Sequence, residues 1–228
     1  MKIEEIEVYG FRAAIRGMHN PKESWAKSDT TYAYFHPEDA KWPGMRVPEN
    51  PHFGPEDLNL MLGLDKGGGA HSKFLRMIDV WWDITIPSCV WAGLDTYKAS
   101  TVRDSCSTMH KLASRDLEPC DFEHGDVDAL VLRVQNQMGH AYRNHFQWCD
   151  SSGTYEGVAL LEHMKMHLPE GFLQKATYSF NYETALKMWF DRHDHPMPQW
   201  SGPGGICETL LRLPLMKELV GAMGQARG

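Results

Sequence analysis

One segment, residues 78–86, constrains the fold of this chain more than any other. Ile78, Val80, Trp82, Ile84 and Ile86 form one alternating set, and Asp79, Trp81, Asp83 and Thr85 form the other. A strict period of two predicts a β-strand with one face buried and the other exposed. Pro87 follows at once, and proline is favoured at the first position of a helix, where its missing N–H costs no hydrogen bond. The sequence therefore predicts a strand that passes directly into a helix.

The other periodic segments predict a mixture of strands and helices. Strands are predicted over 2–9 and at the start of 177–192. Helices are predicted from 55 to the three glycines 67–69, over 126–149 and 155–167, at the end of 177–192, and over 207–220, while 11–17 forms a short helix or a bend. With 228 residues and no internal repeat, the chain is predicted to form a single domain, residues 1–228, around one core. Residues 36–55, with five prolines, are predicted to form a long loop, and residues 221–228 a frayed tail.

Charge and cysteine content exclude several classes of function. A net charge of −7 argues against a nucleic-acid partner, because neutralising phosphates needs clustered Lys and Arg. The five cysteines are odd in number and form no C-x-x-C pair, which predicts a reducing compartment without disulfides. His193 and His195 flank Asp194, but no third ligand is identifiable, so no metal site is predicted. The chain lacks an apolar signal segment and any apolar run near the roughly 20 residues that span a bilayer, so we expect a cytoplasmic protein without a membrane partner.

The turn Thr96-Tyr97-Lys98 and the run that follows it hold the candidate binding residues. Such a turn presents backbone N–H groups and a lysine to an anion, or is simply a solvated turn. From 100 to 108, six of nine residues carry a hydroxyl or a thiol. These side chains either surround a phosphate or a pyrimidine, or bond their own backbone. Cys106 is a nucleophile where a nearby cation stabilises its thiolate, and otherwise a small packed side chain.

The spacing of these residues resembles the signature of the flavin-dependent thymidylate synthases (ThyX). That family has a proline, an apolar helix, Arg-His-Arg, seven residues, a serine, one residue and Arg-Tyr. In this chain Pro87 and an apolar segment precede Thr96-Tyr97-Lys98, and Cys106 follows after seven residues, with Thr108-Met109 one residue beyond. The spacing matches without a gap, although most of the functional residues of the signature differ.

The second half of the chain extends the resemblance, which covers about residues 55–200. The family has a helix ending Ala-Arg, two residues and Leu-Pro, and this chain has Met164-Lys165, two residues and Leu168-Pro169. The family then has an asparagine with an arginine eleven residues later, which correspond to Asn181 and Arg192.

The resemblance implies a fold, a ligand set and roles for individual residues. The implied fold is α/β (α+β), a central sheet flanked by helices, assembled as a homotetramer with active sites between subunits. The implied ligands are FAD and dUMP, with NADPH and methylenetetrahydrofolate as further cosubstrates. The pyrimidine nucleotide is assigned to Lys165, Asp104, Cys106, Thr108 and Arg192, and Arg192 is also the catalytic residue that orients the ring. The cofactor is assigned to Thr96, Tyr97, Lys98 and Asn181.

Several departures from the family pattern remove positive charge. Thr96, Thr108 and Glu183 stand where the family has arginine, so three cations are lost and one anion is gained. A charge-assisted contact contributes about 1.5–3 kcal/mol, so losing two weakens phosphate binding by roughly two to four decades. Four functions stay open. The first is C5 methylation of dUMP or a related pyrimidine by a divergent ThyX-like enzyme, and the second is nucleotide sequestering or sensing without catalysis. The third is a transferase or hydrolase that depends on Cys106, and the fourth is a structural or interaction role.

Overall fold

The computed structural model describes residues 1–33, 44–67 and 69–227, and the chain forms two compact units. The first, here called the α5–α6 unit, comprises Met1–Lys2, Thr85–Thr96 and Asp104–Ala176. The second, here called the sheet unit, comprises Ile3–Ile84, Tyr97–Arg103 and Thr177–Gly228. Strands β1, β5, β6 and β9 contribute residues to both, and the single domain expected for residues 1–228 stays a prediction.

A five-stranded sheet has the order β3-β1-β5-β9-β6. The strands are β1 (Lys2–Tyr9), β3 (Met45–Arg46), β5 (Asp79–Pro87), β6 (Val102–Ser105) and β9 (Leu173–Asn181). The strand predicted from the period of two is the central strand β5, and its even-numbered residues are buried as the alternation requires. Trp82 of β5 packs on Phe180 of β9 with ring centroids 4.6 Å apart. Two short antiparallel pairs, β2 (Thr31–Tyr32) with β4 (Pro51–His52) and β7 (Trp148–Asp150) with β8 (Gly153–Tyr155), complete the strands of the described chain.

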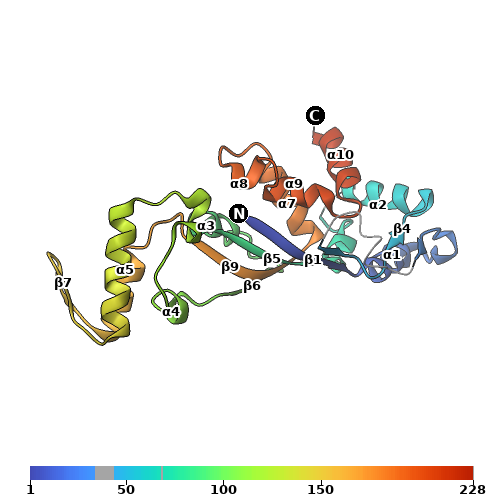
Figure 1. Ribbon diagram of the computed structural model, residues 1–228. Coiled ribbons are helices and arrows are strands. Elements are labelled where there is room, and N and C mark those ends of the chain that lie inside the picture. The colour runs from blue at the N-terminus through green and yellow to red at the C-terminus, as the bar shows by residue number, and fades with distance from the viewer. Residues whose placement is uncertain (34–43, 68, 228) are drawn as a thin grey trace. The chain divides into compact units, whose positions relative to one another are not determined.

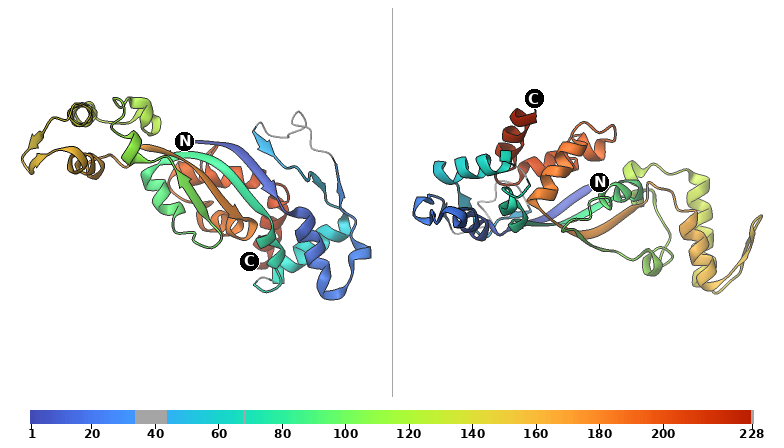
Figure 2. Two further views of the ribbon diagram at one scale, coloured as in Figure 1. Left: turned by 90° about the horizontal axis from the view of Figure 1, so that it is seen from below. Right: turned by 180° about the vertical axis from the view of Figure 1, so that it is seen from behind.

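The sheet unit contains six of the ten helices of the described chain. They are α1 (Phe11–His19), α2 (Pro55–Gly67), α7 (Tyr182–Arg192), α8 (Pro198–Ser201), α9 (Ile206–Arg212) and α10 (Met216–Arg227), with the 3₁₀ turns η1 (Asn20–Lys22), η2 (Trp25–Lys27) and η4 (Lys73–Met77). Helices α7 and α9 lie on the same side of the sheet in Figure 1, and the views in Figure 2 agree. Phe11 of α1 packs edge-on against Tyr182 of α7, with ring centroids 5.7 Å apart. The α/β architecture with helices on a central sheet confirms the fold class that the sequence resemblance implied.

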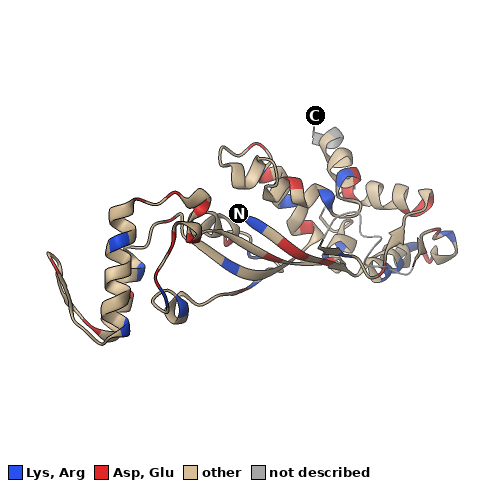
Figure 3. Cartoon of the chain, viewed as in Figure 1, with Lys and Arg blue, Asp and Glu red and all other residues tan. Residues whose placement is uncertain are grey.

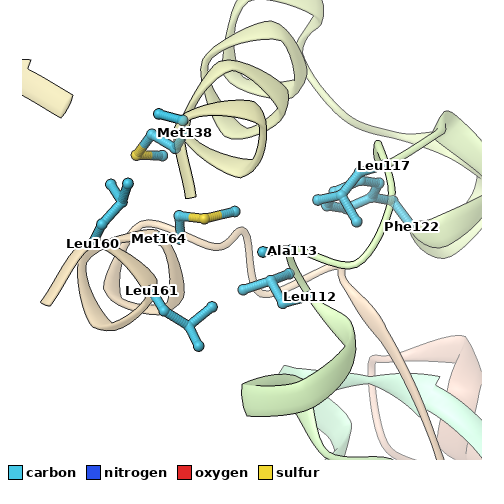
Figure 4. Packing of buried hydrophobic residues seen from close by; sticks show 9 residues of the cluster. Leu112, Ala113, Leu117, Phe122, Met138, Leu160, Leu161 and Met164 are labelled. Atoms are coloured by element: carbon cyan, nitrogen blue, oxygen red, sulfur yellow. The ribbon is translucent and has the colours of Figure 1, made fainter. Parts of the chain in front are cut away.

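The α5–α6 unit has a separate apolar core. Its helices are α3 (Ser88–Leu94), α4 (Thr108–Lys111), α5 (Ala129–Arg143) and α6 (Gly157–Met166), with 3₁₀ turns η5 (Pro119–Asp121) and η6 (Glu123–Gly125). Figure 4 shows Met138 of α5 facing Leu160 and Met164 of α6. The Gln135 amide nitrogen donates to the Met164 and His167 carbonyls at 3.2 and 2.9 Å, which fixes α5 against the end of α6.

Two predicted helices have different bounds in the structure. The helix predicted over 126–149 ends at Arg143, because His145 takes a left-handed φ of 57° and the chain continues into the β7–β8 hairpin. Along α5, Leu130 is 57% exposed and Met138 is buried. The helix predicted over 207–220 is divided into α9 and α10, because Leu213, which precedes Pro214, is extended.

The predicted tail and loop also differ from the structure. Residues 221–227 form the last turns of α10, which contacts α2 and buries Leu219 and Ala222. Of the predicted loop 36–55, residues 36–43 lie outside the described residues, and the remainder holds β3 and β4. Among the described residues, no helix has both the length and the apolar character needed to cross a membrane.

Candidate functional site

Helix α7 carries two of the predicted site residues, one at each end. Asn181 is the N-cap of α7, and its buried side-chain oxygen accepts a hydrogen bond from the Thr184 backbone N–H at 3.0 Å. Asparagine is favoured at this position because it satisfies a backbone donor that has no partner in the helix. Arg192 occupies the last turn, where a cation complements the helix dipole. The spacing of eleven residues between the two therefore equals the length of one helix.

Arg192 is held by two buried aromatic side chains. Its Nε donates to the Tyr97 hydroxyl at 3.4 Å, and its Cζ lies 5.0 Å from the centre of the Trp200 ring. Tyr97 and Trp200 are 6% and 2% exposed, so their positions are fixed by packing. No carboxylate of the described residues forms an ion pair with Arg192. The guanidinium is oriented by the protein, and most of its five donors remain available to a ligand.

The Tyr97 hydroxyl connects Arg192 to a second charged pair. It donates to Asp191 Oδ2 at 3.3 Å, and the same oxygen accepts from Lys187 Nζ at 2.8 Å. Burial raises the pKa of Tyr97 while the Arg192 hydrogen bond lowers it, and the net direction is upward. Tyr97 is therefore protonated at neutral pH, as its role as a donor requires. Lys187 and Asp191 were missed as site residues, and their spacing of four on a helix was the available signal.

A cavity of about 340 Å³ lies against α7 in the sheet unit. Its polar lining includes Glu183, Lys187 and Asp191 from α7 and the buried Asp65 from α2, and its apolar lining includes Leu75 and Phe190. A volume of this order is at the lower end of small-molecule sites. Asp191 links this cavity to Tyr97, although neither Tyr97 nor Arg192 lines it. Cations and anions alternate along α7 and α9 without forming a patch of one sign (Figure 3).

The remaining cofactor residues lie in the turn after α3. The Thr96 hydroxyl donates to the Gly93 carbonyl at 2.7 Å, so it caps the end of α3. Lys98 is exposed and has no hydrogen bond or ion pair within the described residues, so it is the one cation that the turn offers. Glu183 lies 3.8 Å from Arg76 in an exposed ion pair. The turn therefore offers Lys98 to one anionic group of a cofactor.

Four predicted nucleotide-binding residues lie in the α5–α6 unit. Asp104 belongs to β6, Thr108 opens α4, and Lys165 is exposed in the last turn of α6. Cys106 is exposed, and its backbone N–H donates to the Lys175 carbonyl at 2.9 Å, which continues the pairing of β6 with β9. Within the described residues, no hydrogen bond or ion pair joins Lys165 to the other three. The structure thus brings Tyr97 and Arg192 into contact, and the functional assignments of all the predicted site residues stay predictions. Nor does the described part of the chain contain a group of three side chains suited to a metal ion.

Comparison with known proteins gives matches in structure but none to a family model or a curated sequence. No family model and no curated protein matches the sequence. Two solved structures of the flavin-dependent thymidylate synthase ThyX from Helicobacter pylori, both in complex with FAD and dUMP, match 99% of this chain and 93% of theirs. Each has a TM-score of 0.56 and 14% sequence identity. The chain therefore has the fold of the flavin-dependent thymidylate synthases.

Proposed function

We propose that this protein binds a pyrimidine nucleotide and, with FAD, acts at C5 of dUMP or a related pyrimidine. The observation that carries the proposal is the geometry of Arg192. Its guanidinium is oriented by Tyr97 and Trp200 and has no carboxylate partner in the described chain. Holding such a group unpaired has a cost that a ligand would offset, because a buried or half-buried donor prefers a partner. The planar fork suits the carbonyl oxygens of a pyrimidine edge.

FAD is the cofactor that this proposal requires. The two Helicobacter pylori structures hold FAD and dUMP together, which supports the same pairing here. In this chain Lys98 would contact the anionic part of the flavin, and Tyr97 and Asn181 would lie on the flavin side. A bound flavin would supply redox chemistry, and NADPH and methylenetetrahydrofolate would be the reductant and the carbon donor. Because Lys98 is the one exposed cation of its turn, we expect FAD to bind more weakly than it would to an Arg-His-Arg turn.

The α5–α6 unit, considered by itself, offers residues that could bind a phosphate. Lys165 is exposed at the end of α6, and Asp104, Cys106 and Thr108 follow one another along β6 and α4. A lysine contacts phosphate as a point charge and cannot form the two parallel bonds of an arginine. The proposal therefore favours a ligand with one phosphate over a dinucleotide at these residues.

A homotetramer is part of the same proposal. The α5–α6 unit has exposed apolar side chains that include Leu130 at 57%, Phe146 at 57%, Val158 at 70% and Met166 at 73% exposure. Large exposed apolar patches mark protein–protein contacts, so we propose that neighbouring subunits cover these side chains. Sedimentation of the purified protein would give a mass near four chains of 26.0 kDa if the proposal holds.

A second candidate function is nucleotide binding without catalysis. It is favoured by the Glu183–Arg76 ion pair, which places a carboxylate where the family has an arginine. Such a protein would sequester or sense a nucleotide. It would be stabilised by dUMP or dCMP in the absence of flavin and would show no turnover.

The visible absorption spectrum of the purified protein, before and after addition of FAD, separates these functions. Flavin bands that remain bound after gel filtration support the enzyme. Thermal stabilisation by dUMP without any retained flavin supports the binding protein. Arg192→Gln tests the site in both cases and is expected to abolish the stabilisation, whereas Arg16→Gln, an exposed residue of α1, should leave it intact. A purified protein that retains no flavin and is not stabilised by any pyrimidine nucleotide would contradict the proposal.

A further inference from the structure

Three side chains near the end of α1 form a continuous hydrogen-bonded chain. The Ser24 hydroxyl lies 2.8 Å from His19 Nδ1, and His19 Nε2 lies 2.6 Å from Asp57 Oδ1. With the ring proton on Nε2, the imidazole donates to the carboxylate and its Nδ1 accepts from the serine. This arrangement of a hydroxyl, a base and an orienting carboxylate is the one that activates a serine for nucleophilic attack.

The three side chains differ in burial in the order that these roles require, with the carboxylate the most buried and the hydroxyl the least. Asp57 is fully buried, His19 is 3% exposed, and Ser24 is half-buried. Burial alone would raise the pKa of Asp57, but hydrogen bonds from Thr30, His19 and Ser28 hold it below its usual value. The carboxylate therefore stays ionised and can stabilise the imidazolium that forms when His19 takes a proton.

The backbone before Ser24 is fixed in an uncommon conformation. Helix α1 ends at His19, the turn η1 follows, and Glu23 adopts a left-handed φ of 49°. The Ser24 backbone N–H donates to the His19 carbonyl at 3.2 Å, which brings the serine back over the imidazole. A non-glycine residue in this region costs of order 1–3 kcal/mol, and such residues are concentrated at functional sites.

Ser24 also opens onto a cavity of about 570 Å³. His19 and Ser24 line it together with Lys22, Lys27, Glu56 and Leu60. Lys22 and Lys27 together with Glu23 and Glu56 give the lining charges of both signs, and Leu60 is an apolar member of it. The cavity is large enough for a small polar ligand.

We propose that Ser24 is a catalytic nucleophile and that this cavity hydrolyses small esters with a short acyl group. Ser24 Oγ bonds to the ester carbonyl carbon while His19 Nδ1 takes the hydroxyl proton. The bond to the alcohol oxygen then breaks, and the proton held by His19 passes to that oxygen. Water, deprotonated by His19, then attacks the acyl-serine. The bond to Ser24 Oγ breaks, the acid leaves, and His19 returns the proton to Ser24 Oγ. Lys22 or Lys27 would stabilise the negative charge on the carbonyl oxygen during both steps.

A purely structural role is the opposing explanation. Asp57 also accepts from the Ser28 hydroxyl at 2.8 Å and from the Asp29 and Thr30 backbone N–H groups at 3.2 and 3.0 Å. These bonds fix the segment 28–30 against α2 and do not require Ser24. A structural role thus predicts that Ser24 is chemically inert.

The test uses the full chain, p-nitrophenyl acetate as substrate and a fluorophosphonate probe with peptide mapping. We expect labelling at Ser24 and ester hydrolysis that falls by about 100-fold or more in Ser24→Ala, because this variant lacks the nucleophile. Ser114→Ala is the control, because Ser114 is an exposed serine outside this cavity whose hydroxyl donates to the Lys111 carbonyl. It should retain labelling and hydrolysis.

Absence of labelling at Ser24, or equal hydrolysis by the wild type and Ser24→Ala, would overturn the proposal. Thermal unfolding of each variant shows whether a loss arises from misfolding, and labelling of the wild type decides the question even if Ser24→Ala is unstable. The assay contains neither flavin nor nucleotide, so its outcome is independent of the function proposed above.

Discussion

Arg192 Nε lies 3.4 Å from the Tyr97 hydroxyl oxygen, and that hydroxyl in turn donates to Asp191 at 3.3 Å. The tyrosine thus uses both its acceptor and its donor capacity on neighbouring residues of α7. Tyr97 therefore holds the Arg192 side chain in position.

Replacing Tyr97 with phenylalanine should therefore loosen Arg192 without removing its charge. We expect a loss of about 1 kcal/mol in unfolding free energy for the two hydrogen bonds, and about a fivefold weaker affinity for dUMP. Calorimetric titration with dUMP and thermal unfolding measure the two quantities. Tyr142→Phe is the control, because Tyr142 is half-buried in the α5–α6 unit and makes no hydrogen bond through its hydroxyl within the described chain. Unchanged dUMP affinity in Tyr97→Phe would mean that Trp200 alone orients the guanidinium.

Asn181 has a structural role as the N-cap of α7, and substitutions can separate this role from flavin binding. Asn181→Asp keeps an oxygen acceptor for the Thr184 N–H, whereas Asn181→Ala removes it. We expect Asn181→Ala to cost about 1 kcal/mol of stability and Asn181→Asp to cost less.

Flavin retention by the same two variants gives the second readout. If Asn181 contacts FAD through its amide N–H₂, Asn181→Asp should lose flavin while keeping its melting temperature. Equal flavin retention by Asn181→Asp and the wild type would show that Asn181 acts only as the N-cap of α7.

The regular elements around the site could be predicted because their patterns are local. The alternation over 78–86 predicted β5, and the mixed pattern of 177–192 predicted a strand followed by a helix, as found in β9 and α7. The ends of helices were harder to predict, because they depend on residues with a left-handed backbone and on prolines. Nothing in the sequence marks His145 as left-handed, so the helix over 126–149 was predicted too long.

The contacts within the candidate site depend on tertiary structure and were not predictable from sequence. Tyr97 and Arg192 are 95 residues apart, and the ring that packs on Arg192 comes from α8. The hydrogen-bonded chain through Ser24, His19 and Asp57 joins a turn to a distant helix in the same way. Periodicity assigns a residue to a face of its own element, but not to the partner that the face meets.

Cysteine reactivity should divide the five thiols into two groups. Burial raises the pKa of Cys207 to about 12, with a smaller opposing effect from Arg192, whereas Cys89, Cys106, Cys120 and Cys149 are exposed. At pH 8 only about one Cys207 in 10⁴ would be a thiolate. We expect iodoacetamide to modify the exposed cysteines and to spare Cys207 in the native protein, as mass spectrometry of peptides would measure.

Cys106 has a further test within this experiment. If it were the nucleophile of a transferase or hydrolase, it would react faster than Cys89 and Cys149, which share its exposure. Equal rates would remove the reason to assign it a catalytic role. Rapid modification of Cys207 in the native protein would instead show that α9 opens on the time scale of the reaction.

The final prediction concerns acid stability and the turn η5. Asp121 accepts two hydrogen bonds from the Arg115 guanidinium, at 2.7 and 2.5 Å, and one from the Glu118 backbone N–H at 2.8 Å. The Arg115 hydrogen bonds are the main reason that the pKa of Asp121 lies below its usual value. A carboxylate with a lowered folded-state pKa contributes stability that is present above its unfolded pKa, about 3.9, and is lost as pH falls through the folded value. Asp121→Asn should therefore lower the unfolding free energy by about 1 kcal/mol at pH 7, and the difference from the wild type should shrink below about pH 4.

Urea unfolding at pH 7 and pH 3 measures this difference in unfolding free energy. Asp194→Asn, which changes an exposed residue after α7, is the control. A difference that stayed constant down to pH 3 would mean that the side chain acts through packing and not through its charge.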